Sequence, residues 1–175
     1  MVADECRITK EGNPYYAWHT KGQTPIKRQK LEIHKGVNIF GALSMKTGKI
    51  IYLTAKKKNG QAAAALLDKS KEFKNRHFNE KDKILLIWDN VSCHKSQEVK
   101  HWLTQNPNQI ELDNFPPYSP EMNPIEKVWK KLKQRINHLR GEASLIEITQ
   151  KAREFLNNNA FHYKLLGFGN LRIFK

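Results

Sequence analysis

The sequence predicts a mixed α/β domain in which strands come first and helices then alternate with strands. Two apolar segments, residues 37–43 and 49–54, flank Lys46-Thr-Gly48, a pattern typical of a β-hairpin with a glycine in its loop. Residues 83–88 form an apolar run that ends at Asp89, as in a buried strand. Helical periodicity appears on both sides of that run, which indicates one sheet with helices packed against it.

The first 35 residues predict a strand followed by irregular chain. Residues 2–8 are a short, strand-like opening, and Gly12-Asn-Pro14 is a turn. Residues 15–18 are a second extended piece. Residues 21–35 are basic and rich in turn formers, which favours a flexible excursion between the first strand and the hairpin.

Two helices and a strand are expected between the hairpin and residue 112. Residues 62–73 carry apolar side chains at the helical period, and residues 96–103 repeat that pattern through Val99, Trp102 and Leu103. Residues 109–112 read as a short strand. Because Trp102 falls on an apolar stripe, we expect it in the core rather than on a binding surface.

The segment after Asn123 predicts the best-defined helix of the chain. Asn123, with Glu126 three residues further on, is close to a capping box, so the helix start has a purely structural explanation. Glu126, Lys130 and Lys133 share a face that differs from the apolar one. The apolar stripe consists of Ile125, Val128, Trp129, Leu132, Ile136 and Leu139.

A last helix is expected to begin at Ser144. Ser144-Leu-Ile-Glu147 is a capping box. The side chains predicted to face inward are those of Leu145, Ile148, Ala152 and Phe155. Residues 160–175 form a C-terminal tail that is apolar enough to dock on the domain or on a second subunit.

Composition limits the classes of function. A chain of 175 residues is long enough for one domain with a substantial core. The net charge is +14, from 31 Lys and Arg against 17 Asp and Glu, which points to a polyanionic partner, most simply nucleic acid. A merely soluble basic surface is the alternative that charge alone leaves open.

The sequence also predicts a cytoplasmic chain. No apolar run approaches the roughly 20 residues of a membrane helix, and no signal peptide precedes Asp4. Cys6 and Cys93 are the two cysteines and form no Cys-X-X-Cys motif, so neither a disulfide framework nor a zinc site is expected. Cys93 is interpreted as inert.

Three acidic positions on separate elements suggest a metal-dependent phosphoryl-transfer site. Asp4-Glu5 lies in the first strand, Asp89 ends the buried strand, and Glu126 opens the main helix. Carboxylates held at rigid element ends suit a hard cation such as Mg²⁺. Each acid also has a structural reading, because a strand-end Asp is often a loop carboxylate and Glu126 fits a cap.

Five motifs follow one another along the chain: Asp4-Glu5, Trp18-His-Thr-Lys-Gly22, Asn38-Ile-Phe-Gly-Ala42, Trp88-Asp-Asn-Val-Ser-Cys-His94, and Pro116-Pro-Tyr-Ser-Pro-Glu-Met-Asn-Pro-Ile-Glu-Lys-Val-Trp129. In this order they resemble the DDE transposases of the mariner-like superfamily, in its bacterial insertion-sequence branch. The resemblance runs from Asp4 to about Phe155. The last motif is highly specific, whereas Asp4-Glu5 alone is weak.

The resemblance implies an RNase H-like, retroviral-integrase-like fold over residues 1–159, with a catalytic triad of Asp4, Asp89 and Glu126. It also implies two Mg²⁺ or Mn²⁺ ions held by these acids, with Asp89 bridging both. The expected activity is cleavage of DNA and strand transfer during transposition. We further expect Asn90, His94 and Asn123 to position the acids without binding the metal ions themselves. Lys130 and Lys133 are expected to contact DNA.

The sequence departs from that family at its start. Met1 lies three residues before Asp4, so the first strand is expected to be truncated and the family's helix-turn-helix recognition domain to be absent from this chain. A homodimer is a further expectation. The alternatives are an inactive remnant that binds DNA without sequence preference and a different RNase H-like nuclease.

Overall fold

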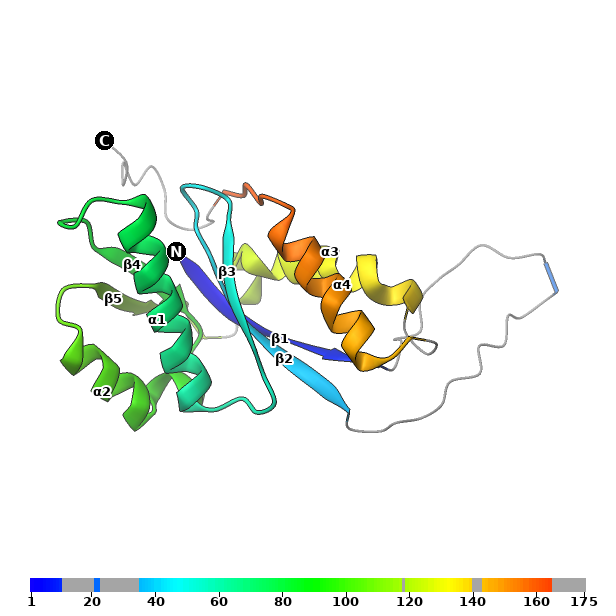
Figure 1. Ribbon diagram of the computed structural model, residues 1–175, viewed down its shortest axis with the longest axis horizontal. Helices are drawn as coiled ribbons and strands as arrows, with labels where there is room; N and C mark the ends of the chain where they lie inside the picture. The colour runs from blue at the N-terminus through cyan, green and yellow to red at the C-terminus, as the bar shows by residue number, and fades with distance from the viewer. Residues whose placement is uncertain (11–20, 23–34, 118, 140–142, 165–175) are drawn as a thin grey trace.

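The computed structural model describes residues 1–10, 21–22, 35–117, 119–139 and 143–164, and it shows one mixed sheet flanked by helices (Figure 1). The sheet has the strand order β3-β2-β1-β4-β5. Its strands are β1 Val2–Thr9, β2 Gly36–Leu43, β3 Ile50–Ala55, β4 Ile84–Trp88 and β5 Ile110–Asn114. The α-helices are α1 Gly60–His77, α2 Gln97–Gln105, α3 Ile125–Ile136 and α4 Leu145–Asn157. Short 3₁₀ turns occupy η1 Ser92–Lys95, η2 Pro120–Met122 and η3 Asn137–Leu139.

Strand β1 is the centre of the sheet. It pairs antiparallel with β2 along its whole length, from Val2 opposite Leu43 to Thr9 opposite Gly36. It pairs in parallel with β4 at Val2 and Ile87. Since β4 and β5 are also parallel, the sheet is antiparallel on one side of β1 and parallel on the other, and β1 and β4 lie side by side.

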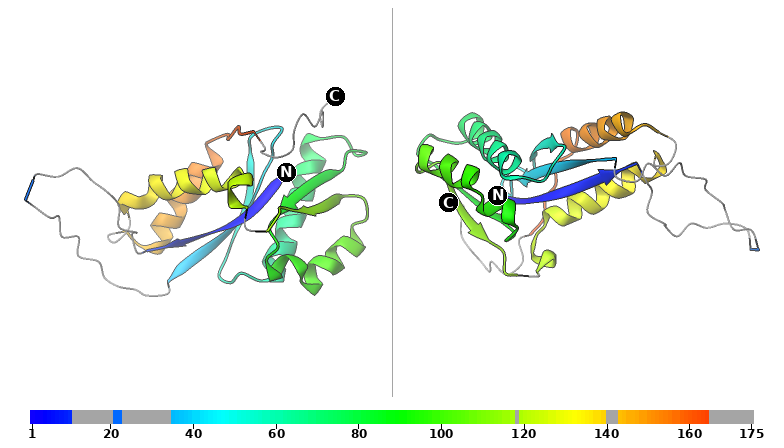
Figure 2. Two further views of the ribbon diagram at one scale, coloured as in Figure 1. Left: turned by 180° about the vertical axis from the view of Figure 1, so that it is seen from behind. Right: turned by 90° about the horizontal axis from the view of Figure 1, so that it is seen from below.

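The helices form two layers, with α1 and α2 on one face of the sheet and α3 and α4 on the other (Figure 2). Side chains alternate along a strand, so each face of β1 contributes to a different core. Val2, Cys6 and Ile8 pack with α3 and α4, whereas Ala3 packs with α1 and α2. Asp4 therefore faces the α3 side and Glu5 the opposite side.

The predicted elements are confirmed with small changes of boundary. Five of the six residues predicted for the stripe of α3 are at most 1% exposed, and the sixth, Leu139, is partly buried against the same core. Trp102 is 6% exposed and lies in the core, as expected. The hairpin loop reaches a left-handed backbone at Gly48, where φ is +70°, a conformation that glycine adopts without strain.

Two helix starts test the predictions of capping. Ser144 caps α4 as expected, because its side chain accepts a hydrogen bond from the Glu147 amide at 3.2 Å. The capping box of Asn123 and Glu126, which was the structural alternative for the start of α3, is not formed. Pro124 occupies the N-cap position of α3 without a side-chain cap, and the Asn123 side chain instead accepts from the Ile125 amide at 3.3 Å.

The inward face of α4 is shifted by one position from the prediction. Ile148 and Ala152 are buried as predicted, but Leu156 is the third buried side chain. Leu145 and Phe155 are only partly buried. The side chain that is buried in the last turn of α4 is therefore that of Leu156 rather than that of Phe155.

The chain after α4 returns to the domain. Phe161 is 5% exposed in the core beneath α3 and α4, and its amide donates to the Gly48 carbonyl at 2.7 Å. Lys127 and Lys131 of α3 lie over the ring of Tyr163, at 5.6 and 5.4 Å from its centre. This part of the predicted tail therefore packs on its own domain.

Some expectations fall outside the described residues: the turn at 12–14, the extended piece at 15–18, nearly all of the excursion at 21–35, and the tail beyond residue 164. No helix in the ranges that the structure describes is long and apolar enough to span a membrane.

Candidate active site

Asp4 is held in place by a tryptophan of α3. The Trp129 Nε1–H donates a hydrogen bond to Asp4 Oδ2 at 3.0 Å. Gly41 is the residue opposite Asp4 on β2, and a Cβ atom there would lie only 2.6 Å from the Trp129 ring. The indole therefore occupies the space that glycine leaves free, and this position lets it reach the carboxylate.

The pKa of Asp4 shows that this carboxyl group faces other acids. Burial and, next in size, the negative charge of Glu126 raise the pKa of Asp4 from 3.8 to about 7, with smaller contributions from the charges of Glu5 and Asp89. A buried carboxylate near like charges takes up a proton unless a cation compensates. Asp4 is thus electrostatically coupled to both other acids of the predicted triad.

Asp89 lies directly after β4 with its side chain 43% exposed. His94 Nδ1 is 3.0 Å from Asp89 Oδ1, and the Val91 amide donates to the same oxygen at 3.4 Å. The hydrogen bond from His94 lowers the pKa of Asp89 below its usual value. In contrast to Asp4, Asp89 is therefore kept ionised.

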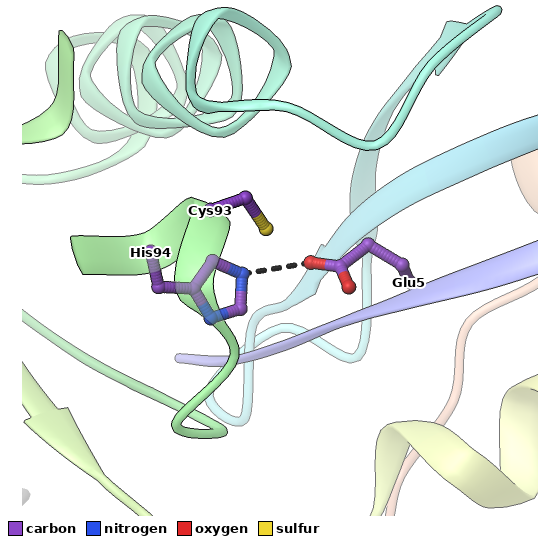
Figure 3. Close-up of side chains that lie close together, drawn as sticks. All are labelled: Glu5, Cys93 and His94. Carbon is purple, nitrogen blue, oxygen red and sulfur yellow. Dashed lines mark hydrogen bonds and ion pairs between the residues drawn. The ribbon is translucent and has the colours of Figure 1, made fainter. Parts of the chain in front are cut away.

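His94 bridges Asp89 and Glu5. Its ring stacks on Trp88 with centroids 4.0 Å apart and planes 2° from parallel. Its Nε2 lies 2.7 Å from Glu5 Oε1 (Figure 3). Burial opposes a charge on His94, but the hydrogen bonds to Asp89 and Glu5 outweigh it and raise the pKa to about 9. A protonated His94 then donates from both ring nitrogens, one to each carboxylate.

Glu126 stands in the first turn of α3 and is exposed. The helix start is tied to β1 by Asn123, whose Nδ2 donates to the Ala3 carbonyl at 3.1 Å. Asn123 is only 6% exposed, so this is a buried link between the residue before Asp4 and the turn that carries Glu126. This contact supports the predicted role of Asn123 in positioning the acids.

The other predicted site residues lie at the margin. Asn90 Nδ2 donates to the Phe115 carbonyl at 3.1 Å, so it joins the ends of β4 and β5. Lys130 and Lys133 are exposed on α3. The Pro-rich lead-in to Glu126 is described except for Tyr118.

Two residues near the acids, Glu5 and Trp129, were not recognised as part of the site from the sequence. Glu5 was considered only as the neighbour of Asp4, yet its side chain is 2% exposed and its Oε2 lies 3.1 Å from Lys58 Nζ. Trp129 was assigned to the core, which is correct, but a buried indole N–H usually requires an acceptor. This requirement could have indicated, from the sequence, that Trp129 donates to a polar group such as a carboxylate.

The donor set of the three acids fits a hard divalent ion. All its ligand atoms are carboxylate oxygens, which Mg²⁺ and Mn²⁺ prefer. The raised pKa of Asp4 reflects a negative potential that a bound cation would relieve. The tightest group of possible ligands in the described part of the chain is a different one, made of Glu5, Cys93 and His94.

The fold defines the class of protein. The mixed sheet with helices on both faces is an RNase H-like fold, in which Asp4 lies on central β1, Asp89 directly after the neighbouring β4 and Glu126 in the first turn of α3. The family of DDE superfamily endonucleases matches residues 1–148, and the chain belongs to this family. Membership implies that activity depends on a divalent metal ion.

Sequence and structure comparisons agree with this assignment. The chain is 31% identical over 143 residues to an uncharacterised 39 kDa protein of insertion element IS630 from Shigella sonnei, a match covering 79% of this chain and 39% of the relative. The chain therefore spans about two fifths of the curated relative's length.

Solved structures of Mos1 transposase share the fold. A paired-end complex with the left transposon end aligns with a TM-score of 0.54 and 11% identity, over 93% of this chain and 56% of that one. A Mos1 mariner paired-end complex with Mn aligns with a TM-score of 0.56 and 12% identity, over 90% and 52%.

Proposed function

We propose that this chain is the catalytic domain of an insertion-element transposase, which cleaves DNA at the element ends and joins the freed 3′ hydroxyl to target DNA. Its family is one of endonucleases, and the curated relative is encoded by an insertion element. The Mos1 neighbours, whose fold this chain shares, were solved as complexes of paired transposon ends.

The catalytic residues in this proposal are Asp4, Asp89 and Glu126. The observation that carries it is the pKa of Asp4, raised to about 7 by burial and by the charges of the other acids. A fold rarely retains such a cost without a function, and perturbed carboxylates gather at active sites. A purely structural buried acid is usually paired with a cation at hydrogen-bond distance, whereas the Asp4 side chain accepts from the neutral indole of Trp129.

The proposed cofactor is a pair of Mg²⁺ or Mn²⁺ ions held by these acids. When bound, such ions provide an activated water and charge stabilisation for in-line displacement at phosphorus. The protein's part is to fix the acids in place. Trp129 orients Asp4, His94 holds Asp89, and Asn123 fixes the start of the helix that bears Glu126 against β1.

DNA is the proposed partner. The net charge of +14 favours a polyanion, and Lys130 and Lys133 extend from Glu126 along the exposed face of α3. We assign them to the phosphates of the strand that reaches the acids. Base-specific recognition would fall to other parts of the transposase, and a homodimer acting in the cytoplasm completes the proposal.

The test is nicking of supercoiled plasmid DNA with and without Mg²⁺ or Mn²⁺. We expect metal-dependent nicking that falls by at least about a hundredfold in Asp4→Asn and in Glu126→Gln. Asp113→Asn, an exposed acid on β5, is the matched control and should retain activity. Cleavage of the RNA strand of a hybrid in preference to DNA would instead indicate an RNase H-type hydrolase. Nicking that survives both substitutions would refute the site.

A further inference from the structure

On the face of the sheet opposite Asp4, three side chains with metal-binding atoms converge (Figure 3). A carboxylate oxygen of Glu5, the sulfur of Cys93 and a ring nitrogen of His94 all lie within 4.8 Å of one another. Glu5 comes from the central strand β1, whereas Cys93 and His94 are neighbours in η1. Glu5 lies 88 positions before Cys93 and 89 before His94, so the fold brings it to the other two residues.

We propose that Glu5, Cys93 and His94 form a second metal site, one for a divalent transition-metal ion of the Zn²⁺ class. It is distinct from the oxygen-only site of Asp4, Asp89 and Glu126. The sequence does not lead us to expect a zinc site, because the chain has no Cys-X-X-Cys motif. The ligands here are assembled across the sheet, so no short motif could have indicated them.

The spacing suits tetrahedral coordination. Zn²⁺ bonds of about 2.0–2.3 Å place neighbouring ligand atoms roughly 3.3–3.8 Å apart. The three atoms are already within 4.8 Å of one another, so we expect small side-chain adjustments to bring them to these distances. Three protein ligands leave the fourth position to water, as in sites that remain open to exchange.

Glu5 brings a buried carboxylate to this site. Its side chain is 2% exposed, and its Oε1 atom lies 2.7 Å from His94 Nε2. The partner of its buried Oε2 atom is Lys58, whose Nζ lies 3.1 Å away and whose side chain is 47% exposed. A long, half-exposed lysine can withdraw into water at low cost. A buried carboxylate oxygen is then available to a metal ion.

His94 is oriented as a metal-binding histidine usually is. In such sites the ring nitrogen that does not bind the ion donates to a carboxylate or carbonyl, which fixes the ring. Here His94 Nδ1 lies 3.0 Å from both the Oδ1 and the carbonyl oxygen of Asp89, and Trp88 stacks on the ring. Nε2 is thereby directed at Glu5, on the side where the Cys93 sulfur lies (Figure 3).

The donor atoms select the ion. Sulfur and imidazole favour Zn²⁺, Co²⁺ and related ions over Mg²⁺, whereas an all-carboxylate site has the opposite preference. Metal binding releases the protons of the Cys93 thiol and of His94 Nε2, and the resulting thiolate, carboxylate and neutral imidazole around one divalent ion sum to zero charge. That neutrality matters because a net charge in a largely buried site is costly.

The experiment is a titration of the full chain with Co²⁺, which serves as a spectroscopic probe for Zn²⁺. A thiolate–Co²⁺ charge-transfer band should appear in the near ultraviolet, saturate at one equivalent, and disappear when Zn²⁺ is added. A large excess of Mg²⁺ should leave it in place. Asp4→Asn and Glu126→Gln should also retain it, which separates this site from the proposed catalytic acids.

Substitutions in the site should act differently. Cys93→Ser should abolish the band, and Glu5→Gln should weaken Co²⁺ binding by about tenfold or more. Cys6→Ala is the matched control: Cys6 is the other thiol of the chain, is buried on the opposite face of the sheet, and should not affect the band. Circular dichroism verifies the fold of each variant. Absence of the band in the unmodified chain, its persistence in Cys93→Ser, or its loss in Cys6→Ala alone would overturn the proposal.

Discussion

The Trp129 Nε1–H donates to Asp4 Oδ2 at 3.0 Å, although the two residues lie 125 positions apart. The contact joins the hydrophobic core to the proposed active site, because Trp129 is 1% exposed and packs over Gly41 on the neighbouring strand. The orientation of a catalytic carboxylate is thus set by how α3 packs on the sheet. A change in that packing should affect activity before it affects the fold.

Trp129→Phe tests this relationship. The substitution removes the donor and part of the ring, so we expect the free energy of unfolding to fall by about 1–3 kcal/mol. DNA nicking should fall by at least about tenfold because Asp4 loses its orientation. The measurements are urea unfolding and plasmid nicking at a temperature where the variant remains folded.

The matched control is Trp102→Phe. Trp102 is also a buried indole, and its Nε1–H donates to a carboxylate, Asp68, at 2.5 Å on the other face of the sheet. It should lose comparable stability and keep its nicking activity. If both variants lose activity in proportion to stability, the Trp129 contact has no specific role in orienting Asp4.

Asp4→Asn should stabilise the metal-free protein, and more so at higher pH. Asp4 has a pKa of about 7 in the folded state against 3.8 when unfolded. The unfolded chain therefore releases this proton first, and stability is lost as the pH rises from about 4 through 7. Asparagine does not titrate, so its advantage should grow by roughly 2 kcal/mol between pH 5 and pH 8. Unfolding by urea in the presence of a chelator measures it.

For Asp89→Asn we expect the opposite effect on the free energy of unfolding, which should fall. The hydrogen bond from His94 lowers the pKa of Asp89 in the folded state. Its contribution to stability is therefore present above the unfolded pKa near 4 and is lost only as the pH falls through the lower folded value. The substitution should destabilise the chain by a constant amount between pH 5 and pH 8. An identical pH trend in the two variants would contradict the assigned environments.

Divalent metal should stabilise the folded chain. Mg²⁺ or Mn²⁺ bound to the native state raises the melting temperature by mass action, and Asp89→Asn should abolish that rise while the fold is retained. Asp113→Asn, an exposed acid at the end of β5, should respond to metal as the unmodified chain does. A metal-induced rise that persists in Asp89→Asn would show that the ions bind elsewhere.

The elements that could be predicted from the sequence are those with a local pattern. The stripe of α3, the two apolar segments of the hairpin and the apolar run of β4 are each visible in neighbouring residues of the sequence, and the structure confirms all three elements. Asp89 and Glu126 were proposed because each stands at an element boundary, whereas Asp4 was chosen over Glu5 by resemblance to the family. The contact of Asn123 with Ala3 could not be predicted, because it depends on the tertiary fold.

The connections between the acids could not be predicted. His94 and Glu5 are 89 positions apart and meet only because β1 and β4 are adjacent in the sheet. Alternation along β1 explains why Asp4 and Glu5 lie on opposite faces, but it does not indicate that His94 links Glu5 to Asp89. Strand order decides such contacts, and no local pattern records it.

The path of DNA is the last prediction. Lys130 and Lys133 are exposed and share the face of α3 that begins at Glu126. Replacing both by Gln should weaken binding to random duplex DNA and reduce the slope of log affinity against log salt by up to about two. Stability should barely change, since neither residue is in the buried stripe. Fluorescence anisotropy at several salt concentrations provides the measurement.

The control must remove two charges elsewhere. Lys127 and Lys131 are unsuitable because both pack over Tyr163. Lys69 on α1 and Lys100 on α2 are exposed on the opposite layer, and Lys69→Gln with Lys100→Gln makes the same change in net charge. If this pair reduces affinity and salt slope as much as the α3 pair does, the DNA responds to total charge, and the proposed path over α3 is wrong.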